Sequence, residues 1–151
     1  MMRQLFRRLQ SQDRGSAMVE FALIAPILLV MVFGVLQAAF AVHNYNALRN
    51  LSADAARYAV IAHQSGNNLS TTQIRTFAVN HARGAPYLLS GERVNAVVTT
   101  PEVQRIEGAI EMQITVTYQI DSLLAFAGIE MPFITFTRPI FVTDNSIPLP
   151  M

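Results

Sequence analysis

The amino-acid sequence predicts an α+β fold, in which a long N-terminal helix packs on a small three-stranded antiparallel sheet together with a second, short helix. Two patterns predict it. Residues from near Val19 to about Ala62 are helix-like throughout, and residues 110–120 alternate strictly between apolar and polar side chains. Apolar residues at three- and four-residue steps are typical of helices, and strict alternation is typical of half-buried strands. The first half of the long helix is expected to cross a membrane.

The composition of the 151-residue chain excludes several classes of protein. Hydrophobic residues make up 52% of it and charged residues only 14%, whereas a soluble domain carries about 25% charged residues. This balance excludes a disordered chain, which needs low hydrophobicity and high charge. The lack of cysteine excludes a disulfide scaffold, an iron–sulfur protein and a zinc finger. The net charge of +1 predicts no nucleic-acid partner, because phosphate binding needs a clustered basic surface.

The hydrophobicity is concentrated near the N-terminus. Residues 21–36 read FALIAPILLVMVFGVL, and after Gln37 the apolar run continues to Val42. As a helix this run is about 33 Å long, which matches a hydrocarbon core of about 30 Å. Pro26 and Gly34 fit a membrane-spanning helix better than a soluble one. We therefore expect a single span in contact with membrane lipid, in which Gln37 either hydrogen-bonds between helices or faces the headgroups.

The charges that flank the apolar run predict its orientation. Residues 1–15 carry a local charge of +3, which comes from Arg3, Arg7, Arg8 and Arg14 against Asp13. The nearest charges beyond the run are sparse and of mixed sign. Basic residues on the N-terminal side keep that side cytoplasmic. We expect residues 43–151 to form an α+β domain on the other side, in a periplasmic or extracellular space.

A secretory signal peptide is the alternative interpretation of the same segment. Residues 39–41 read AFA, which is a candidate cleavage site for removal of the segment after Ala41. The product would be an exported soluble binding domain that begins at Val42. Against this, an apolar run of about 20 residues is longer than the 7–15 residues that are typical of a signal peptide.

The junction between the basic segment and the apolar run carries further information. It reads RGSAMVEF from Arg14 to Phe21, so that Glu20 immediately precedes the apolar run. Arg14 and Glu20 are separated by about 9 Å along a helix, which places the Glu20 carboxylate inside the membrane edge. A carboxylate there is costly unless it finds a partner or reaches back to the headgroups. Gly15 is either a helix breaker or a residue with a specific role.

Residues 14–37, RGSAMVEFALIAPILLVMVFGVLQ, resemble the N-terminus of TadE-like proteins, the pseudopilins of tight-adherence (Tad, or Flp-type) pilus systems. Phe21 and Pro26 also fit the TadE pattern. In the wider type IV pilin class, a prepilin peptidase cuts after a glycine on the cytoplasmic face, and the fifth residue of the mature chain is glutamate. The resemblance therefore implies cleavage between Gly15 and Ser16, with Glu20 as the fifth mature residue.

The resemblance also implies partners and an organisation of the chain. Glu20 is expected to pair with the new N-terminal amine of a neighbouring pilin or pseudopilin, and Ser16 is a candidate for N-methylation. The implied partners are the prepilin peptidase, other pilins and the assembly platform of the bacterial inner membrane. The implied fold is pilin-like, with a leader at 1–15, a membrane-spanning half-helix at 16–42 and an extracytoplasmic domain at 43–151. The implied role is in pilus biogenesis and surface attachment.

The sequence beyond Val42 predicts the remaining elements. The long helix is expected to bury Leu48, Leu51, Ala55, Tyr58 or Ala59, and Ala62. A second helix is expected over residues 72–83, with Ile74, Phe77, Ala78 and His81 on one side and Gly84 as its stop. Strands are expected from Val94, over residues 110–120 and over residues 133–142. Because Arg138 and Pro139 lie in the third strand, we expect it at an edge. The apolar residues 123–128 between the last two strands could touch a partner or the membrane surface, but burial over the sheet edge is the preferred interpretation.

No pattern in the sequence indicates an enzyme, a cofactor or a metal site. His43, His63 and His81 are 20 and 18 residues apart, which is no metal-binding spacing. No nucleophile motif or phosphate-binding loop occurs. Glu107 and Glu111 are expected to be solvated charges rather than a catalytic pair. The chain is therefore expected to be acted on by enzymes and to have no catalytic residues of its own.

Overall fold

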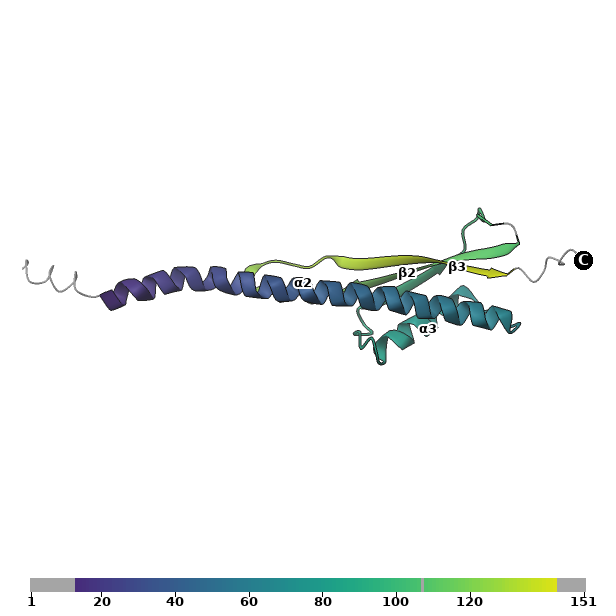
Figure 1. Cartoon of the computed structure of the whole chain (residues 1–151), viewed down its shortest axis with the longest axis horizontal. Coiled ribbons are helices and arrows are strands. Elements are labelled where there is room, and N and C mark those ends of the chain that lie inside the picture. Colours follow the sequence, from purple (N-terminus) through teal and green to yellow (C-terminus); the bar gives the residue numbers. More distant parts are fainter. Residues whose placement is uncertain (1–12, 107, 144–151) are drawn as a thin grey trace, which may run out of the picture. The chain divides into compact units, whose positions relative to one another are not determined.

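The computed structural model describes residues 13–106 and 108–143 (Figure 1). The elements follow one another as α2 (Asp13–Gln64), α3 (Thr71–Arg83), β1 (Val94–Thr99), β2 (Ala109–Gln119), the 3₁₀ turn η1 (Ala125–Ala127) and β3 (Phe133–Thr143). This is the expected α+β, pilin-like arrangement. Most of the basic leader, Glu107 and the C-terminal tail lie outside the described residues.

The chain forms two compact units. One unit combines the N-terminal segment up to Ala38 with Ser122–Glu130, and the other contains residues 39–121 and the chain from Met131 onward. The first unit thus contains the apolar part of α2 and the η1 segment. The second contains the C-terminal part of α2, α3 and the sheet. The η1 segment groups with a part of the chain that is more than 80 residues away in sequence.

Helix α2 is a single helix of 52 residues. It begins at Asp13, six residues before the expected start near Val19, and continues through Pro26 to Gln64. The helix ends at Gln64 and a turn follows, in which Gly66 adopts a positive φ of 78°. The expected buried face is confirmed at Leu48, Leu51, Ala55 and Ala59, which are all fully buried.

Helix α3 begins with a capping box. Ser70 accepts a hydrogen bond from the Gln73 backbone N–H, and the Gln73 side chain accepts one from the Ser70 N–H. These two bonds satisfy donors that a helix N-terminus leaves unpaired. Ile74 and Ala78 are buried as expected. The third buried residue is Ala82 rather than His81, whose side chain is 37% exposed.

The sheet has the order β1-β2-β3, and both pairs of strands are antiparallel. In the register, Val116 lies opposite Ala96 on one side and Phe136 on the other. The expected edge position of β3 is confirmed. One face of β2 buries its alternate apolar residues, which are Met112, Ile114, Val116 and Tyr118. On the other face, Thr115 and Thr117 approach Thr137 and Thr135 of β3 through their hydroxyl groups.

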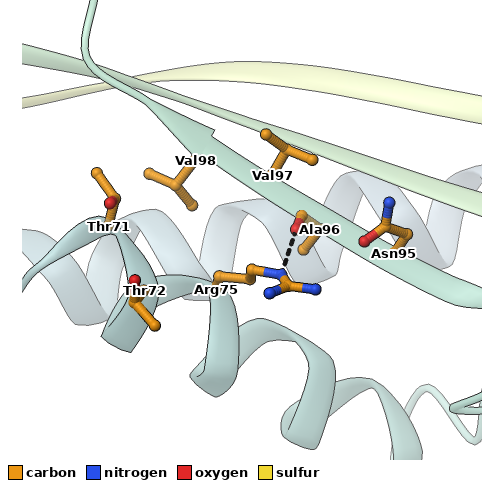
Figure 2. A pocket seen from close by; sticks show the side chains of 7 residues that line it. All are labelled: Thr71, Thr72, Arg75, Asn95, Ala96, Val97 and Val98. Atoms are coloured by element: carbon orange, nitrogen blue, oxygen red, sulfur yellow. Dashed lines mark hydrogen bonds between the residues drawn. The ribbon is translucent and has the colours of Figure 1, made fainter.

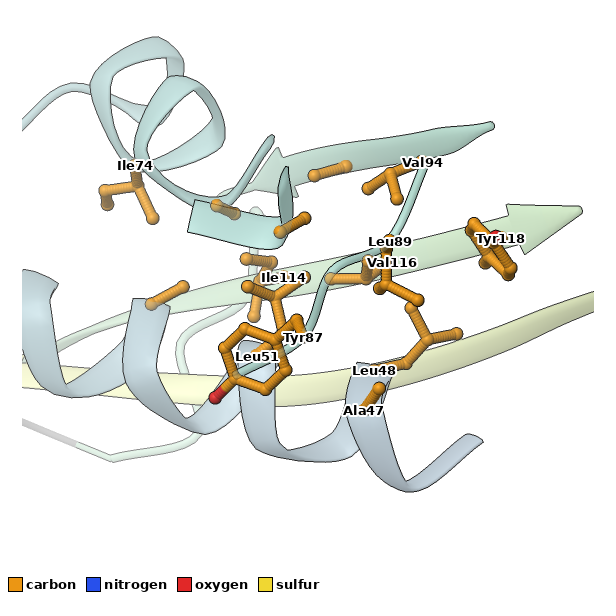
Figure 3. Packing of buried hydrophobic residues seen from close by; sticks show 14 of the residues in the cluster. Ala47, Leu48, Leu51, Ile74, Tyr87, Leu89, Val94, Ile114, Val116 and Tyr118 are labelled. Carbon is orange, nitrogen blue, oxygen red and sulfur yellow. The ribbon is translucent and has the colours of Figure 1, made fainter. Parts of the chain in front are cut away.

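The hydrophobic core of the second unit lies between α2, α3 and the sheet. Figure 3 shows Leu48 and Leu51 of α2 among the side chains of β2 and of the connector that follows α3. Burial of each large apolar side chain stabilises the fold by about 1.5–3 kcal/mol. Tyr87 and Leu89 of the connector also belong to this core, although the sequence predicts only a loop there. Their burial is not predicted from the sequence, because a short connector has no repeating pattern of apolar residues.

Candidate functional site

The junction that the sequence singles out lies in the first turns of α2. Gly15 and Ser16 are helical and exposed. The Ser16 hydroxyl donates a hydrogen bond to Glu20 Oε1 at 3.3 Å, one helical turn further on. No heavy atom would lie within 4 Å of a Cβ added to Gly15. The backbone of Arg14 is helical, but its side chain lies outside the described residues. Among the described residues, none therefore covers Gly15.

The apolar part of α2 is exposed along its length. Phe21 is 69% exposed, and the large apolar side chains after it up to Val42 are largely uncovered as well. Pro26 and Gly34 lie within this stretch, and the helix continues through both. Among the described residues, this helix alone is long and apolar enough to cross a membrane. An apolar surface of this extent needs lipid or protein around it.

Gln37 is the exception on this surface, because it is only 3% exposed. Its side-chain carbonyl oxygen accepts a hydrogen bond of 2.7 Å from the backbone N–H of Leu123. The sequence left two alternatives for Gln37, a bond between helices or contact with headgroups. The structure shows that it also pairs with the loop between β2 and β3, a role that no local pattern indicates.

The segment Ser122–Glu130, which we call the η1 loop, packs against the apolar helix. The Phe126 ring meets the Phe33 ring edge to face, with centroids 5.7 Å apart. Leu124 is buried, whereas Phe126 remains 63% exposed and Ile129 42% exposed. The expected burial of this segment over the sheet edge is therefore wrong for Phe126. The apolar partner of Phe126 in the structure is Phe33 of α2.

A second cluster of polar groups lies in the folded domain, around Asp54 of α2. Tyr87 donates a hydrogen bond to Asp54 Oδ2 at 2.7 Å, and the nearest nitrogens of His81 and Arg57 are 3.6 and 3.5 Å from the same carboxylate. Burial, and then the hydrogen bond and negative charge of Asp54, raise the pKa of Tyr87 to about 12. Tyr87 therefore stays protonated and acts as a fixed donor. The cluster joins α2, α3 and the connector after α3.

Glu111 corrects one expectation from the sequence. It was expected to be solvated, but it is only 3% exposed. Arg105 contacts both of its carboxylate oxygens, and Gln104 accepts a hydrogen bond from its backbone N–H. The hydrogen bonds from Arg105 lower the pKa of Glu111. This pair fixes the loop between β1 and β2, and it is a structural ion pair rather than a pair of acids.

A shallow cavity lies between the start of α3 and β1 (Figure 2). The one charged side chain in its lining, Arg75, donates a hydrogen bond of 2.9 Å from Nε to the backbone oxygen of Ala96. This bond occupies an acceptor of the edge strand β1, which protects the edge from pairing with another strand. Within the described residues, no group of three or more potential metal ligands occurs.

The fold and the site together define a pilin-like α+β protein with an apolar N-terminal helix. Residues 15–57 match the family model of TadE-like proteins. The predicted TadE-like resemblance is thus confirmed over this segment, and it extends beyond the apolar run into the part of α2 that carries the core. The matched segment covers less than half of the chain. No curated protein and no solved structure matches it.

Proposed function

We propose that this chain is a TadE-type minor pseudopilin of the bacterial inner membrane, matured by a prepilin peptidase and used in the biogenesis of a Tad/Flp pilus and in surface attachment. The match to TadE-like proteins over residues 15–57 carries the proposal. Its first residue, Gly15, is the one after which cleavage is expected. In this proposal α2 crosses the membrane with its N-terminus in the cytoplasm, and the domain from residue 43 lies in the periplasm.

Each residue of the junction has a role in this proposal. Arg14 holds the leader in the cytoplasm, and the absence of a side chain at Gly15 admits the backbone to the peptidase. Phe21 begins the lipid-facing surface, and Pro26 and Gly34 lie within the span. Cleavage would remove a leader of charge +3 and leave seven arginines and nine acidic residues in the mature chain.

Glu20 is proposed to drive assembly. A carboxylate at the membrane edge is stabilised by an opposite charge, and cleavage creates a positive amine at Ser16. The Ser16 hydroxyl is an uncharged donor, and its bond to Glu20 is long at 3.3 Å, so a neighbouring subunit's positive amine would be a stronger partner. The expected partners are therefore other pilins and pseudopilins, together with the inner-membrane platform that assembles them.

The alternative is a secreted soluble domain, cut after Ala41. Such a cut would divide α2 and remove both Gln37 and Phe33. The Leu123 N–H would lose its acceptor, and Phe126 would lose its ring contact. These losses favour retention of the whole helix.

Gly15→Ala tests the proposal, with Gly34→Ala as the matched control. Neither new methyl group meets a heavy atom within 4 Å, so both variants are expected to fold. In cells that contain the peptidase, the wild type and Gly34→Ala should lose a leader of about 1.6 kDa and begin at Ser16, whereas Gly15→Ala should keep its leader. A mature chain that begins at Val42 would establish the secreted domain instead, and cleavage of Gly15→Ala at the same bond would contradict the assigned site.

Glu20→Ala tests the assembly step separately. This variant should be cleaved like the wild type, because the leader and Gly15 are intact. Its co-purification with other pilus subunits should fall, since the carboxylate partner of the amine is gone. Normal piliation of cells that carry only this variant would contradict the proposed pairing.

A further inference from the structure

The η1 loop is apolar and yet exposes large side chains, a combination that is unusual in a loop. It reads SLLAFAGI over residues 122–129, with no charged residue. Asp121, which precedes this stretch, and Glu130, the last residue of the η1 loop, are both acidic and exposed. Loops normally run over the wet surface of a protein and are polar. An apolar segment with large exposed side chains and charged ends indicates a surface that meets another apolar phase.

The position of the loop along α2 suggests which phase this is. A hydrocarbon core of about 30 Å is crossed by about 20 helical residues. A span that begins at Ala17 ends at Leu36, and one that begins at Phe21 ends at Phe40. In both cases Phe33 lies about 5–10 Å inside the outer edge of the core. Because the Phe126 ring is in contact with Phe33, Phe126 lies at the acyl chains of the same leaflet.

The backbone of the η1 loop is suited to such an environment. Hydrocarbon cannot hydrogen-bond to peptide groups, so a non-helical segment there must satisfy them within the protein. The Leu123 N–H donates to Gln37 and the Leu124 N–H to the Ser122 hydroxyl. The N–H groups of the last three residues before Glu130 donate to carbonyl oxygens inside the loop; these residues are Ala127, Gly128 and Ile129. The Ser122 hydroxyl in turn donates to the Ile129 carbonyl oxygen at 2.5 Å.

We propose that the η1 loop is a lipid-binding site, which inserts Phe126 and Ile129 into the outer acyl–headgroup boundary of the bilayer that α2 crosses. The proposal rests on the membrane span in the proposed function. Lipid, rather than another protein, is the chosen partner because the loop continues the exposed apolar surface of α2 on the same unit. Gln37 is the positioning residue, since its side chain holds the loop against the helix. The span and the loop then fix the chain at two places in the outer leaflet.

The lack of tryptophan in the sequence allows a direct test. Three full-length variants each carry a single tryptophan: Phe126→Trp in the loop, Leu28→Trp in the span, and Val103→Trp in the loop between β1 and β2. Val103 is 79% exposed and lies outside the η1 loop, which makes it the matched apolar control. Each variant is reconstituted at low protein density into vesicles of phosphatidylcholine and phosphatidylglycerol, with or without phosphatidylcholine brominated on its acyl chains. Bromine quenches tryptophan only on contact, so loss of emission reports lipid at the side chain.

The expected result is that Phe126→Trp and Leu28→Trp lose most of their emission in brominated vesicles, while Val103→Trp loses none. If Leu28→Trp is quenched but Phe126→Trp behaves like Val103→Trp, the loop proposal is overturned and the span stands. If Phe126→Trp has blue-shifted emission without quenching, a protein surface covers the loop, and lipid is excluded as its partner. If Leu28→Trp is not quenched, the span itself is wrong, and the loop proposal fails with it.

Discussion

Replacing Gln37 by methionine is expected to release the η1 loop from α2 without disturbing the helix. Methionine has nearly the same length and helix propensity as glutamine, but it lacks the carbonyl oxygen that accepts the Leu123 N–H at 2.7 Å. A buried donor that loses its acceptor costs about 1–3 kcal/mol. At about 1.4 kcal/mol for each factor of ten, opening of the loop should become about 5- to 150-fold more frequent.

Amide hydrogen exchange in the full-length protein in detergent micelles measures this opening. The Leu123 N–H should exchange faster in Gln37→Met by the factor given above, whereas amides of β2 should be unchanged. Leu36→Met is the control, since it makes a similar change at an adjacent, exposed position of the same helix. An unchanged rate at Leu123 in Gln37→Met, or an equal increase in Leu36→Met, would refute the proposed role of Gln37.

Three further predictions concern the folded domain. Leu51→Ala, at a fully buried position of α2, should lower the free energy of unfolding by about 2–5 kcal/mol in denaturant titrations, whereas Val103→Ala should change it by less than about 0.5 kcal/mol. The pKa of Glu111 in the folded protein is lowered from 4.5. Its stabilising effect is therefore present above pH 4.5 and is lost as the pH falls through the folded-state pKa. Arg105→Gln should flatten this dependence of the unfolding free energy on acid pH. Because the pKa of Tyr87 is raised to about 12, the unfolded chain ionises first, and stability should fall between about pH 10 and 12 by up to about 1.4 kcal/mol per pH unit. Tyr87→Phe should remove that slope, and its persistence would assign it to another group.

The elements that depend on local patterns were predictable. Strict alternation around Ile114 and Val116 predicts β2, because neighbouring side chains of a strand point to opposite faces. The apolar run and the spacing of Leu48 and Leu51 predict both halves of α2 for the corresponding reason in helices. Helical structure already at Asp13 was not predicted, because helix ends depend on a few weak interactions.

The contacts that close over long stretches of sequence were not predictable in the same way. Tyr87 donates to Asp54, which lies 33 residues earlier, and nothing near either residue indicates the other. Glu111 occupies a polar position in the alternation, yet Arg105 makes its burial tolerable. Both cases need the distance between side chains, which a one-dimensional pattern does not contain.

The sequence by itself therefore determined the main parts of this protein: a basic N-terminal segment, a membrane-length apolar helix preceded by a glycine and a glutamate, and a small α+β domain. The helix and the small domain follow from composition or from a period of two or 3.6 residues, which is a local property of the chain, whereas the meaning of the junction is implied by the resemblance to TadE-like proteins. Only the tertiary structure decided that Gln37 serves the η1 loop and that Phe126 lies beside Phe33. The physical reason is that these residues are 86 or more positions apart in the sequence and come into contact only when the chain has folded. The Gln37 side chain then accepts the Leu123 N–H, and the Phe126 ring packs against Phe33.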